Sequence, residues 1–269
     1  MTYTAAVGLS GAIAEFTAAV ENYDRFMGRY ATRLAPKLAD AAGVRADMRV
    51  LDVGCGPGAL AVELAGRVGE DNVAAIDPAP QFAAACQVRV PGADVREGVA
   101  ESLPWGDGTF DAAMCSLVVA WMSDPDQGIG EMARVTKAGG TVAAAMWDLA
   151  GGGVQMLSHF WAAAREIDPS IPDDEPRAGV REGDLVHRFG RAGLQGVTGG
   201  TLETSVDYAD FDDYWEPFTG GAGQATSAFY ASLDDAGKVT LRDTVRASLP
   251  EGPFTLPARA WLALGTVPG

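Results

Sequence analysis

A regular alternation of short apolar runs with helix-length segments over residues 49–146 constrains the fold more than any other feature of this chain. Such alternation is typical of parallel strands joined by crossover helices, and it favours an α/β fold. Apolar residues at helical spacing predict one helix from about Ala59 onward and a second at about 127–136, which Gly139 and Gly140 stop. The expected strands are residues 49–53, 72–76, 93–97, 110–116 and 140–146.

The segments on either side of this core are predicted to be mainly helical. Residues 13–42 are expected to form a helix with a break at Pro36, and Gly151-Gly152-Gly153 is expected to be a flexible hinge. The acidic, proline-containing stretch 170–184 is predicted to be a surface loop. The remaining expected elements are helices at 154–167, 185–192 and within 210–249, and strands at 197–206 and 259–267.

The charge of the chain argues against polyanionic partners. It carries 20 basic and 36 acidic residues, a formal net charge of -16 at pH 7, and no run of Lys or Arg. Repulsion therefore opposes binding to nucleic acid or to anionic lipid, and small-molecule partners are favoured. With 269 residues, 48% of them apolar, the chain can bury the core of one elaborated domain.

Targeting and metal signals are weak in this sequence. The first arginine is Arg25, and polar residues interrupt the early apolar run, so neither a signal peptide nor a membrane span is predicted and a cytoplasmic location is expected. Cys55, Cys86 and Cys115 are odd in number and lack metal-ligand spacing. They predict buried small residues, with no disulfide framework and no metal site.

A glycine-rich turn, Gly54-Cys55-Gly56-Pro57-Gly58, lies between the first expected strand and the first helix. Glycines let the backbone approach a ligand closely, and the following helix directs free N–H groups and its positive dipole end at the same space. Asp77, at the end of the second strand, can accept hydrogen bonds from ribose hydroxyls. Together these features predict a nucleoside site. They also satisfy the dinucleotide pattern G-x-G-x-x-G/A, so a nicotinamide-dependent dehydrogenase stays open at this point.

Four stretches in a fixed order carry a more specific pattern: Val50 to Gly58, Val73 to Pro78, Glu101 to Asp111, and Glu131 to Gly140. Over about residues 49–148 they resemble the class I S-adenosylmethionine-dependent methyltransferases. The resemblance is to the type 11 branch in particular, which includes ubiquinone and menaquinone C-methyltransferase-like enzymes. It implies a three-layer Rossmann-like α/β fold with a mostly parallel seven-stranded sheet, the last strand antiparallel, and a helical cap.

The resemblance implies a cofactor site for S-adenosylmethionine, with S-adenosylhomocysteine as product. Gly54 and Gly56 are expected to pass beneath the methionine part of the cofactor. Asp52 is expected to orient its amino group, directly or through water, and Ser116 to face the same end. The helix that covers the cofactor in this family is expected around residues 23–30, where Tyr23, Met27 and Tyr30 could contact it or pack in the core.

The same resemblance assigns the nucleoside end. Asp77 is expected to hold the ribose, with Pro78 against the adenine, and Ala100 and Glu101 at the adenine edge. Many relatives have an aspartate where this chain has Val99. Because valine cannot accept a hydrogen bond, adenine recognition must then depend on backbone atoms, on Glu101 or on stacking.

The chemistry needs no universal catalytic side chain, because the sulfonium methyl is already activated and the enzyme chiefly aligns the acceptor and excludes water. His159 is the candidate general base, although a solvated surface histidine fits its position as well; His187 is expected at the surface. Trp121, Met122 and Trp147 follow the fourth and fifth strands and are candidate walls of the acceptor site. Five aromatic residues could form a lid or a core: Tyr214, Trp215, Phe218, Phe229 and Tyr230.

The sequence therefore predicts one domain, residues 1–269. It comprises an N-terminal helical cover (1–46), a cofactor-binding core (47–150), and two cap insertions (151–184 and 207–255) that shape the acceptor site. The expected function is methyl transfer from S-adenosylmethionine to an O, N or C atom of a small molecule. A non-catalytic S-adenosylmethionine-binding sensor or accessory protein and, with less support, a dehydrogenase remain alternatives. Neither the acceptor nor the oligomeric state follows from the sequence.

Overall fold

The computed structural model describes residues 20–172, 177–221 and 223–269. Within them, a seven-stranded sheet has the order β3-β2-β1-β4-β5-β7-β6. The parts of the expected N-terminal helix before residue 20 and of the expected acidic loop at 173–176 lie outside the described residues. The strands are β1 (Val50–Val53), β2 (Val73–Asp77), β3 (Asp94–Glu97), β4 (Phe110–Ser116), β5 (Thr136–Trp147), β6 (Gln195–Tyr208) and β7 (Phe254–Thr266).

Strand directions confirm the expected sheet. Strands β1 to β5 pair in parallel, whereas β7 is antiparallel both to β5 and to β6. Among the described strands β7 alone therefore runs opposite to the others. Every residue of β1 and β2 is buried, as expected for parallel strands that helices cover on both faces.

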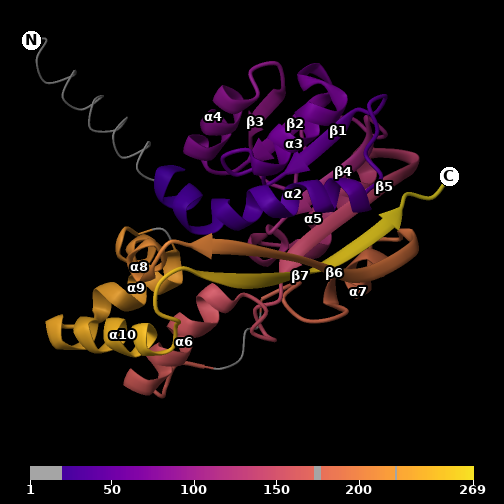
Figure 1. Ribbon diagram of the computed structural model, residues 1–269. Coiled ribbons are helices and arrows are strands. Elements are labelled where there is room, and N and C mark those ends of the chain that lie inside the picture. The colour runs from indigo at the N-terminus through magenta and orange to yellow at the C-terminus, as the bar shows by residue number, and fades with distance from the viewer. Residues whose placement is uncertain (1–19, 173–176, 222) are drawn as a thin grey trace, which may run out of the picture.

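Helices form a layer on each face of the sheet (Figure 1). From β1, helix α3 leads to β2 and helix α4 leads to β3, so these strands are added toward one edge of the sheet. From β4, helix α5 leads to β5, which is added toward the opposite edge. Right-handed crossovers therefore place α3 and α4 on one face and α5 on the other. The helices of this core are α2 (Arg29–Ala41), α3 (Ala59–Val68), α4 (Pro80–Arg89), α5 (Pro125–Val135) and α7 (Asp184–Arg191); the short ones are η1 (Asp24–Gly28), η2 (Glu70–Asn72) and η3 (Val119–Trp121).

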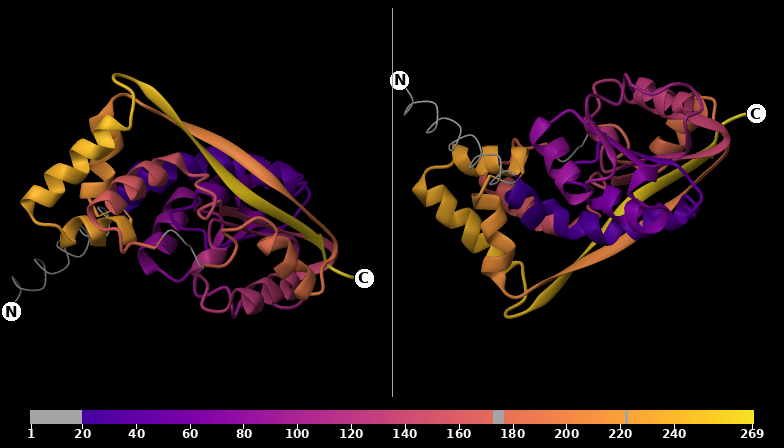
Figure 2. Two further views of the ribbon diagram at one scale, coloured as in Figure 1. Left: turned by 90° about the horizontal axis from the view of Figure 1, so that it is seen from below. Right: turned by 90° about the horizontal axis from the view of Figure 1, so that it is seen from above.

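The cap gathers at the carboxyl ends of the parallel strands. It contains α6 (Gln155–Ile167), α8 (Phe211–Thr219), α9 (Gln224–Ser232) and α10 (Asp235–Ala247). Strands β6 and β7 pair as far as Tyr208 and Phe254, well beyond the end of β5, and this twisted ribbon connects sheet and cap (Figure 2). Among the described residues, no helix is long and apolar enough to cross a membrane.

The expected break at Pro36 is wrong, because α2 continues through it from Arg29 to Ala41. A proline inside a helix costs about 3 kcal/mol. Burial of an apolar face that includes Tyr30, Leu34 and Leu38 outweighs this cost, since each such side chain contributes roughly 1.5–3 kcal/mol. Arg67 also donates from Nη2 to the Pro36 carbonyl at 3.1 Å.

The glycines expected to form a flexible hinge instead surround a buried carboxylate. A Cβ added at Gly151 or Gly153 would lie 2.6 or 2.7 Å from atoms of the Asp148 side chain. Asp148 accepts from the Gly151 N–H at 2.8 Å and pairs with Arg259, while the Arg259 N–H donates to the Gly153 carbonyl. The hinge prediction is therefore wrong, because these glycines allow close packing around Asp148.

Two of the sequence stretches that resemble the family are joined by Arg134. Its guanidinium donates to the carbonyls of Leu103 and Trp105 at 3.0 and 2.9 Å, and it pairs with Glu131 and Asp107. This network fastens the loop after β3 to α5. Helix α5 ends at Val135 and β5 begins at Thr136, so Gly139 and Gly140 lie in the strand and do not stop the helix as expected.

Candidate functional site

The glycine turn after β1 has a backbone that other residues would not tolerate. Gly54, Gly56 and Gly58 have φ values of 72°, 52° and 103°. A Cβ at Gly54 would lie 2.4 Å from a methyl carbon of Val118, and one at Gly58 would lie 3.2 Å from the Cys86 sulfur. Both conformation and space therefore require glycine here.

Backbone hydrogen bonds fix this turn against the end of β2. The N–H groups of Gly54 and Cys55 both donate to the Ile76 carbonyl, at 2.7 and 3.0 Å. No described side chain caps the first turn of α3, which begins directly after Gly58. The first N–H groups of α3 consequently offer donors and a partial positive charge beside the turn.

Asp77 joins the turn to the residues after β2. Its carboxylate accepts from the Gly56 N–H at 2.8 Å through Oδ2 and from the Ala79 N–H at 2.9 Å through Oδ1. Burial raises the pKa of Asp77, and these two hydrogen bonds act in the opposite direction. Each oxygen keeps a further lone pair. The carboxylate thus shapes the turn and can still accept from a ligand.

Asp52 is the most unusual group of the site. Its side chain is only 1% exposed, and neither carboxylate oxygen has a hydrogen-bond partner among the described residues. Burial is the main cause, and the Asp77 charge the second, that raises the pKa of Asp52 to about 8. The Ala61 N–H lowers this pKa, although it does not make a hydrogen bond of normal geometry with the carboxylate. A buried, unpaired carboxylate is costly, and a cationic ligand group would relieve that cost.

Two further unpartnered polar groups lie on the same face of the sheet. Asp52 pairs with Met114, Met114 with Ala143, and Ser116 with Ala145. Because paired residues share a face and side chains alternate along a strand, Asp52, Ser116 and Trp147 all point to the side that carries α3. The Ser116 hydroxyl and the Trp147 indole N–H are buried without a partner among the described residues. We name these three side chains the polar row.

The N-terminal segment covers the glycine turn. The Tyr23 hydroxyl lies 3.9 Å from the position of a Cβ at Gly56, and its ring packs against Phe82 of α4 at 5.3 Å. Burial, followed by the charges of Asp77, Asp24 and Asp52, raises the pKa of Tyr23. The segment is tied to α4 by the Asp24–Arg89 ion pair and to α8 by Arg25–Glu216. Met27 is partly buried against the core.

The residues expected at the adenine edge lie at the loop after β3. Pro78 and Val99 are exposed, whereas Ala100 is buried. The Glu101 carboxylate accepts from the Asp124 N–H at 3.1 Å, and its carbonyl accepts from Gln127. Glu101 therefore connects this loop to the start of α5, and its role toward adenine stays a prediction.

The candidate acceptor residues lie in different environments. Trp121 is 60% exposed beneath the Arg177 guanidinium, 4.2 Å from the ring centroid. Trp147 is buried. Its ring contacts the Tyr30 ring edge to face, with 6.1 Å between the ring centroids. Trp215 is buried in the cap and stacks on Phe211 at 5.8 Å, so its environment is that of core packing.

His159 lies on α6, where Nδ1 is 2.9 Å from the Ser248 hydroxyl. Burial lowers the pKa of His159. No described hydrogen bond joins it to the glycine turn, and its role as a base remains a prediction. His187 is exposed, as expected.

Several residues beside the site were absent from the sequence predictions. Leu117 has φ 67°, the only described non-glycine residue with positive φ, and it precedes Val118, which covers Gly54. Tyr208 of β6 meets Tyr30, with 3.0 Å between the two hydroxyls. Nothing in their local sequence distinguishes these residues, because their positions depend on the assembled sheet.

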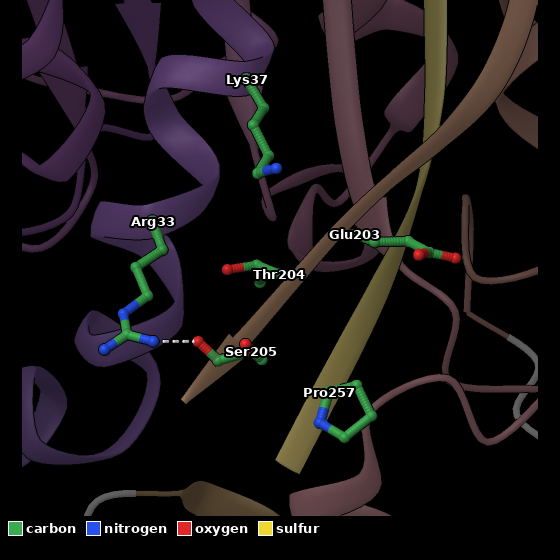
Figure 3. A pocket seen from close by; sticks show the side chains of 6 residues that line it. All are labelled: Arg33, Lys37, Glu203, Thr204, Ser205 and Pro257. Atoms are coloured by element: carbon green, nitrogen blue, oxygen red, sulfur yellow. Dashed lines mark hydrogen bonds between the residues drawn. The ribbon is translucent and has the colours of Figure 1, made fainter. Parts of the chain in front are cut away.

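The open cavity beside α2 does not include the predicted site residues. It measures about 480 Å³ and lies between α2 and the β6–β7 ribbon (Figure 3). Arg33, which donates to the Ser205 carbonyl, and Lys37 line its α2 side. The glycine turn is instead covered by Val118 and Tyr23.

The cysteines are free and buried, as expected. Contact with the Cys86 thiol and burial raise the pKa of Cys55. Among the described residues there is no group of His, Cys, Asp and Glu that could hold a metal ion.

Comparison with known proteins identifies the family of the core. A family model described as "Methyltransferase domain" matches residues 51–144. An uncharacterized protein of Mycobacterium tuberculosis is 31% identical over 147 residues, which cover 53% of this chain and 52% of that protein. The malonyl-acyl-carrier-protein O-methyltransferase of Erwinia billingiae is 33% identical over 128 residues, 47% of this chain and 49% of the relative. The chain thus spans about half the length of the curated relatives it matches.

Solved structures agree on the fold. A putative methyltransferase from Bacillus halodurans superposes with a TM-score of 0.56 at 19% identity, covering 87% of this chain and 99% of that one. The cyclase SpnF superposes with a TM-score of 0.54 at 20% identity, covering 88% and 82%. At these identities the likeness concerns the fold alone. The match over residues 51–144 therefore identifies this segment as a methyltransferase domain of the class I S-adenosylmethionine-dependent, type 11 family.

Proposed function

We propose that this protein transfers the methyl group of S-adenosylmethionine to an O, N or C atom of a small-molecule acceptor. The observation that carries the proposal is Asp52, whose two buried carboxylate oxygens have no partner among the described residues. The cofactor has an α-ammonium group of the required charge. A charge-assisted hydrogen bond to that group would stabilise the ionised carboxylate by roughly 1.5–3 kcal/mol.

The remaining residues fit the rest of the cofactor. At Gly56 an added Cβ would meet only the Tyr23 hydroxyl, at 3.9 Å, so the backbone there is open to a ligand; Gly54 lets the chain turn beneath Val118. Asp77 keeps lone pairs for the ribose hydroxyls, and Ser116 supplies a buried hydroxyl near the methionine end. Pro78, Ala100 and Glu101 remain the proposed residues of the adenine edge.

In this mechanism the bound cofactor supplies an activated sulfonium methyl group. The protein holds that group in line with the acceptor atom and excludes water. Tyr23 covers the turn, and we assign Met27 to the same cover. The cap helices α6, α8, α9 and α10 are grouped on one side of the sheet (Figure 1). Trp121, Trp147 and Trp215 are the proposed acceptor-side residues, and His159 remains a candidate base for acceptors that must lose a proton.

The acceptor itself is not inherited from the relatives. The Erwinia billingiae relative is named for methylation of malonyl-acyl-carrier protein, but it matches only 47% of this chain. We place acceptor selection in the cap segments 151–184 and 207–255.

The dehydrogenase alternative has little support beyond the glycine pattern. A sensor or accessory role remains the second alternative. SpnF, named as a cyclase, shares the fold without being named for methyl transfer. A fold of this kind therefore need not transfer methyl groups.

Two measurements test the proposal. First, thermal unfolding with S-adenosylhomocysteine or NAD should show a rise in Tm with the former only, because a ligand that binds the folded state stabilises it. Second, release of S-adenosylhomocysteine from S-adenosylmethionine should depend on an acceptor in a panel of phenols, amines and acids. Binding without turnover across the panel would favour the sensor, and stabilisation by NAD alone would favour the dehydrogenase.

A further inference from the structure

The Trp147 end of the polar row contains hydrogen-bond donors that have no hydrogen-bond acceptor among the described residues. Trp147 is 4% exposed, and its indole N–H has no partner among the described residues. A buried N–H without a partner is uncommon in folded proteins and costs about 1–3 kcal/mol. Such a donor is expected where a ligand completes it.

The neighbours of Trp147 add a second such donor. Its ring meets Tyr30 edge to face, and the Tyr30 hydroxyl lies 3.0 Å from that of Tyr208. One hydroxyl donates to the other, so the second O–H has no acceptor among the described residues. We name Trp147, Tyr30 and Tyr208 the donor cluster; all three side chains are buried.

The sheet register places Trp147 beyond the cofactor end of the row. Asp52 is level with Ala143 across two strand spacings, and Trp147 lies four residues further along β5. These offsets correspond to about 10 Å across the sheet and about 13 Å along it. Ser116 lies between, level with Ala145. The row thus leads from the carboxylate end to the donor cluster on one face.

The charges around the donor cluster favour a neutral ligand group. The nearby cation is Arg29, whose guanidinium lies 4.5 Å from the centre of the Tyr208 ring. Both Asp213 oxygens and the Asp207 carbonyl already accept from it. A ligand carboxylate would therefore be buried beside neutral donors without a cation to balance its charge, because Arg29 is already paired. Burial of such a charge is costly.

We propose that the Trp147 indole N–H donates a hydrogen bond to a neutral carbonyl or hydroxyl oxygen of the methyl acceptor. The acceptor class is thus an oxygen-bearing neutral molecule whose ring or chain packs against Tyr30 and Tyr208. This inference rests on the proposed methyl transfer, and it makes Trp147 a specificity-determining residue of that reaction.

The test compares two phenols of similar shape, 4-hydroxyacetophenone with a carbonyl and 4-ethylphenol without one. In the wild type we expect the carbonyl compound to have the higher kcat/KM. Trp147→Phe keeps an aromatic ring but removes the donor, and it should reduce this preference about fivefold to tenfold, the usual value of one neutral hydrogen bond. The Kd for S-adenosylhomocysteine should stay unchanged.

Trp261→Phe is the matched control. Trp261 lies on β7 and pairs with Met146, on the opposite face to Trp147, and its N–H donates to the Val180 carbonyl at 3.3 Å. This variant should keep the wild-type preference. An undiminished preference in Trp147→Phe, or an equal loss in Trp261→Phe, would overturn the assignment.

A spectroscopic arm separates this inference from the proposed function. In protein with 15N-labelled indoles and saturating S-adenosylhomocysteine, 4-hydroxyacetophenone should shift the indole N–H signal that disappears in Trp147→Phe, and 4-ethylphenol should not. If neither phenol is methylated but this signal shifts selectively, the methyl-transfer proposal fails for this class while the donor site stands. If methylation occurs without any selective shift, the donor site is refuted and methyl transfer stands.

Discussion

The two ends of the polar row carry buried polar groups of different kinds. At the β1–β2 end, Asp52 and Asp77 bring two carboxylates together, of which Asp77 is held by backbone N–H groups and Asp52 by none. At the β5 end, Trp147 and the Tyr30–Tyr208 pair present neutral donors. The first arrangement suits a ligand with an ammonium and hydroxyl groups, whereas the second suits a neutral oxygen. One face of the sheet therefore carries two groups of buried polar side chains of opposite hydrogen-bonding character.

The largest expected effect comes from a substitution in the glycine turn, at the Asp52 end of the polar row. Gly54→Ala would set a Cβ 2.4 Å from Val118 at φ 72°, so the turn must shift. We expect the affinity for S-adenosylhomocysteine to fall about 100-fold, a loss of about 2.7 kcal/mol of binding free energy, because the displaced turn loses its contacts with the ligand. Calorimetric titration measures it. Gly69→Ala is the control, since Gly69 has φ 82° with nothing within 4 Å; an equal loss there would mean that backbone strain alone is responsible.

Removing one carboxylate should have a smaller effect. Asp77→Ala loses the acceptor for Gly56 and Ala79 as well as the proposed ribose contact. We expect the Kd for S-adenosylhomocysteine to rise about 10- to 100-fold, equivalent to one charged hydrogen bond of roughly 1.5–3 kcal/mol. Asp77→Asn, which keeps one oxygen, should lie between. Unchanged binding in Asp77→Ala would restrict Asp77 to shaping the turn.

The two carboxylates should also set the pH dependence of stability. The folded-state pKa of Asp52, about 8, exceeds its usual value of 3.8, so between these values the folded state binds more protons than the unfolded state. The free energy of unfolding should therefore fall with rising pH, by at most about 1.4 kcal/mol per pH unit. Asp52→Asn should flatten this dependence and bind S-adenosylhomocysteine more weakly. Denaturant titrations from pH 5 to 8 measure it, and parallel curves for the two proteins would contradict the account.

The smallest effect concerns the ties between the cover and the cap. Arg29 makes a two-pronged contact with Asp213 and is partly buried, whereas the Arg25–Glu216 pair is more exposed. Arg29→Ala should lower the free energy of unfolding by about 1 kcal/mol and Arg25→Ala by a few tenths. Equal losses in chemical denaturation would show that burial does not separate the two pairs.

The core of the fold was predictable because its signals are local. Apolar runs, the glycine turn and Asp77 lie within short stretches, and the expected strands agree with β1 to β5 within a few residues. The predictions at Pro36 and at Gly151-Gly152-Gly153 were wrong because tertiary contacts decide there: burial of one face of α2 and packing around Asp148.

The site was predictable only in part, for the same reason. Asp52, Ser116 and Trp147 each stood among the candidates, but their alignment depends on strand register, which no single stretch specifies. The positive φ of Leu117 and the contact of Tyr30 with Tyr208 likewise arise only in the assembled sheet.

The most direct test of the central claim is a calorimetric titration of S-adenosylhomocysteine into the wild type and Asp52→Asn at pH 7. The account predicts one site per chain and weaker binding in the variant, because the neutral amide that replaces the carboxylate lacks the charge that holds the ammonium group. Absence of binding to the wild type, or equal affinity in both proteins, would contradict it.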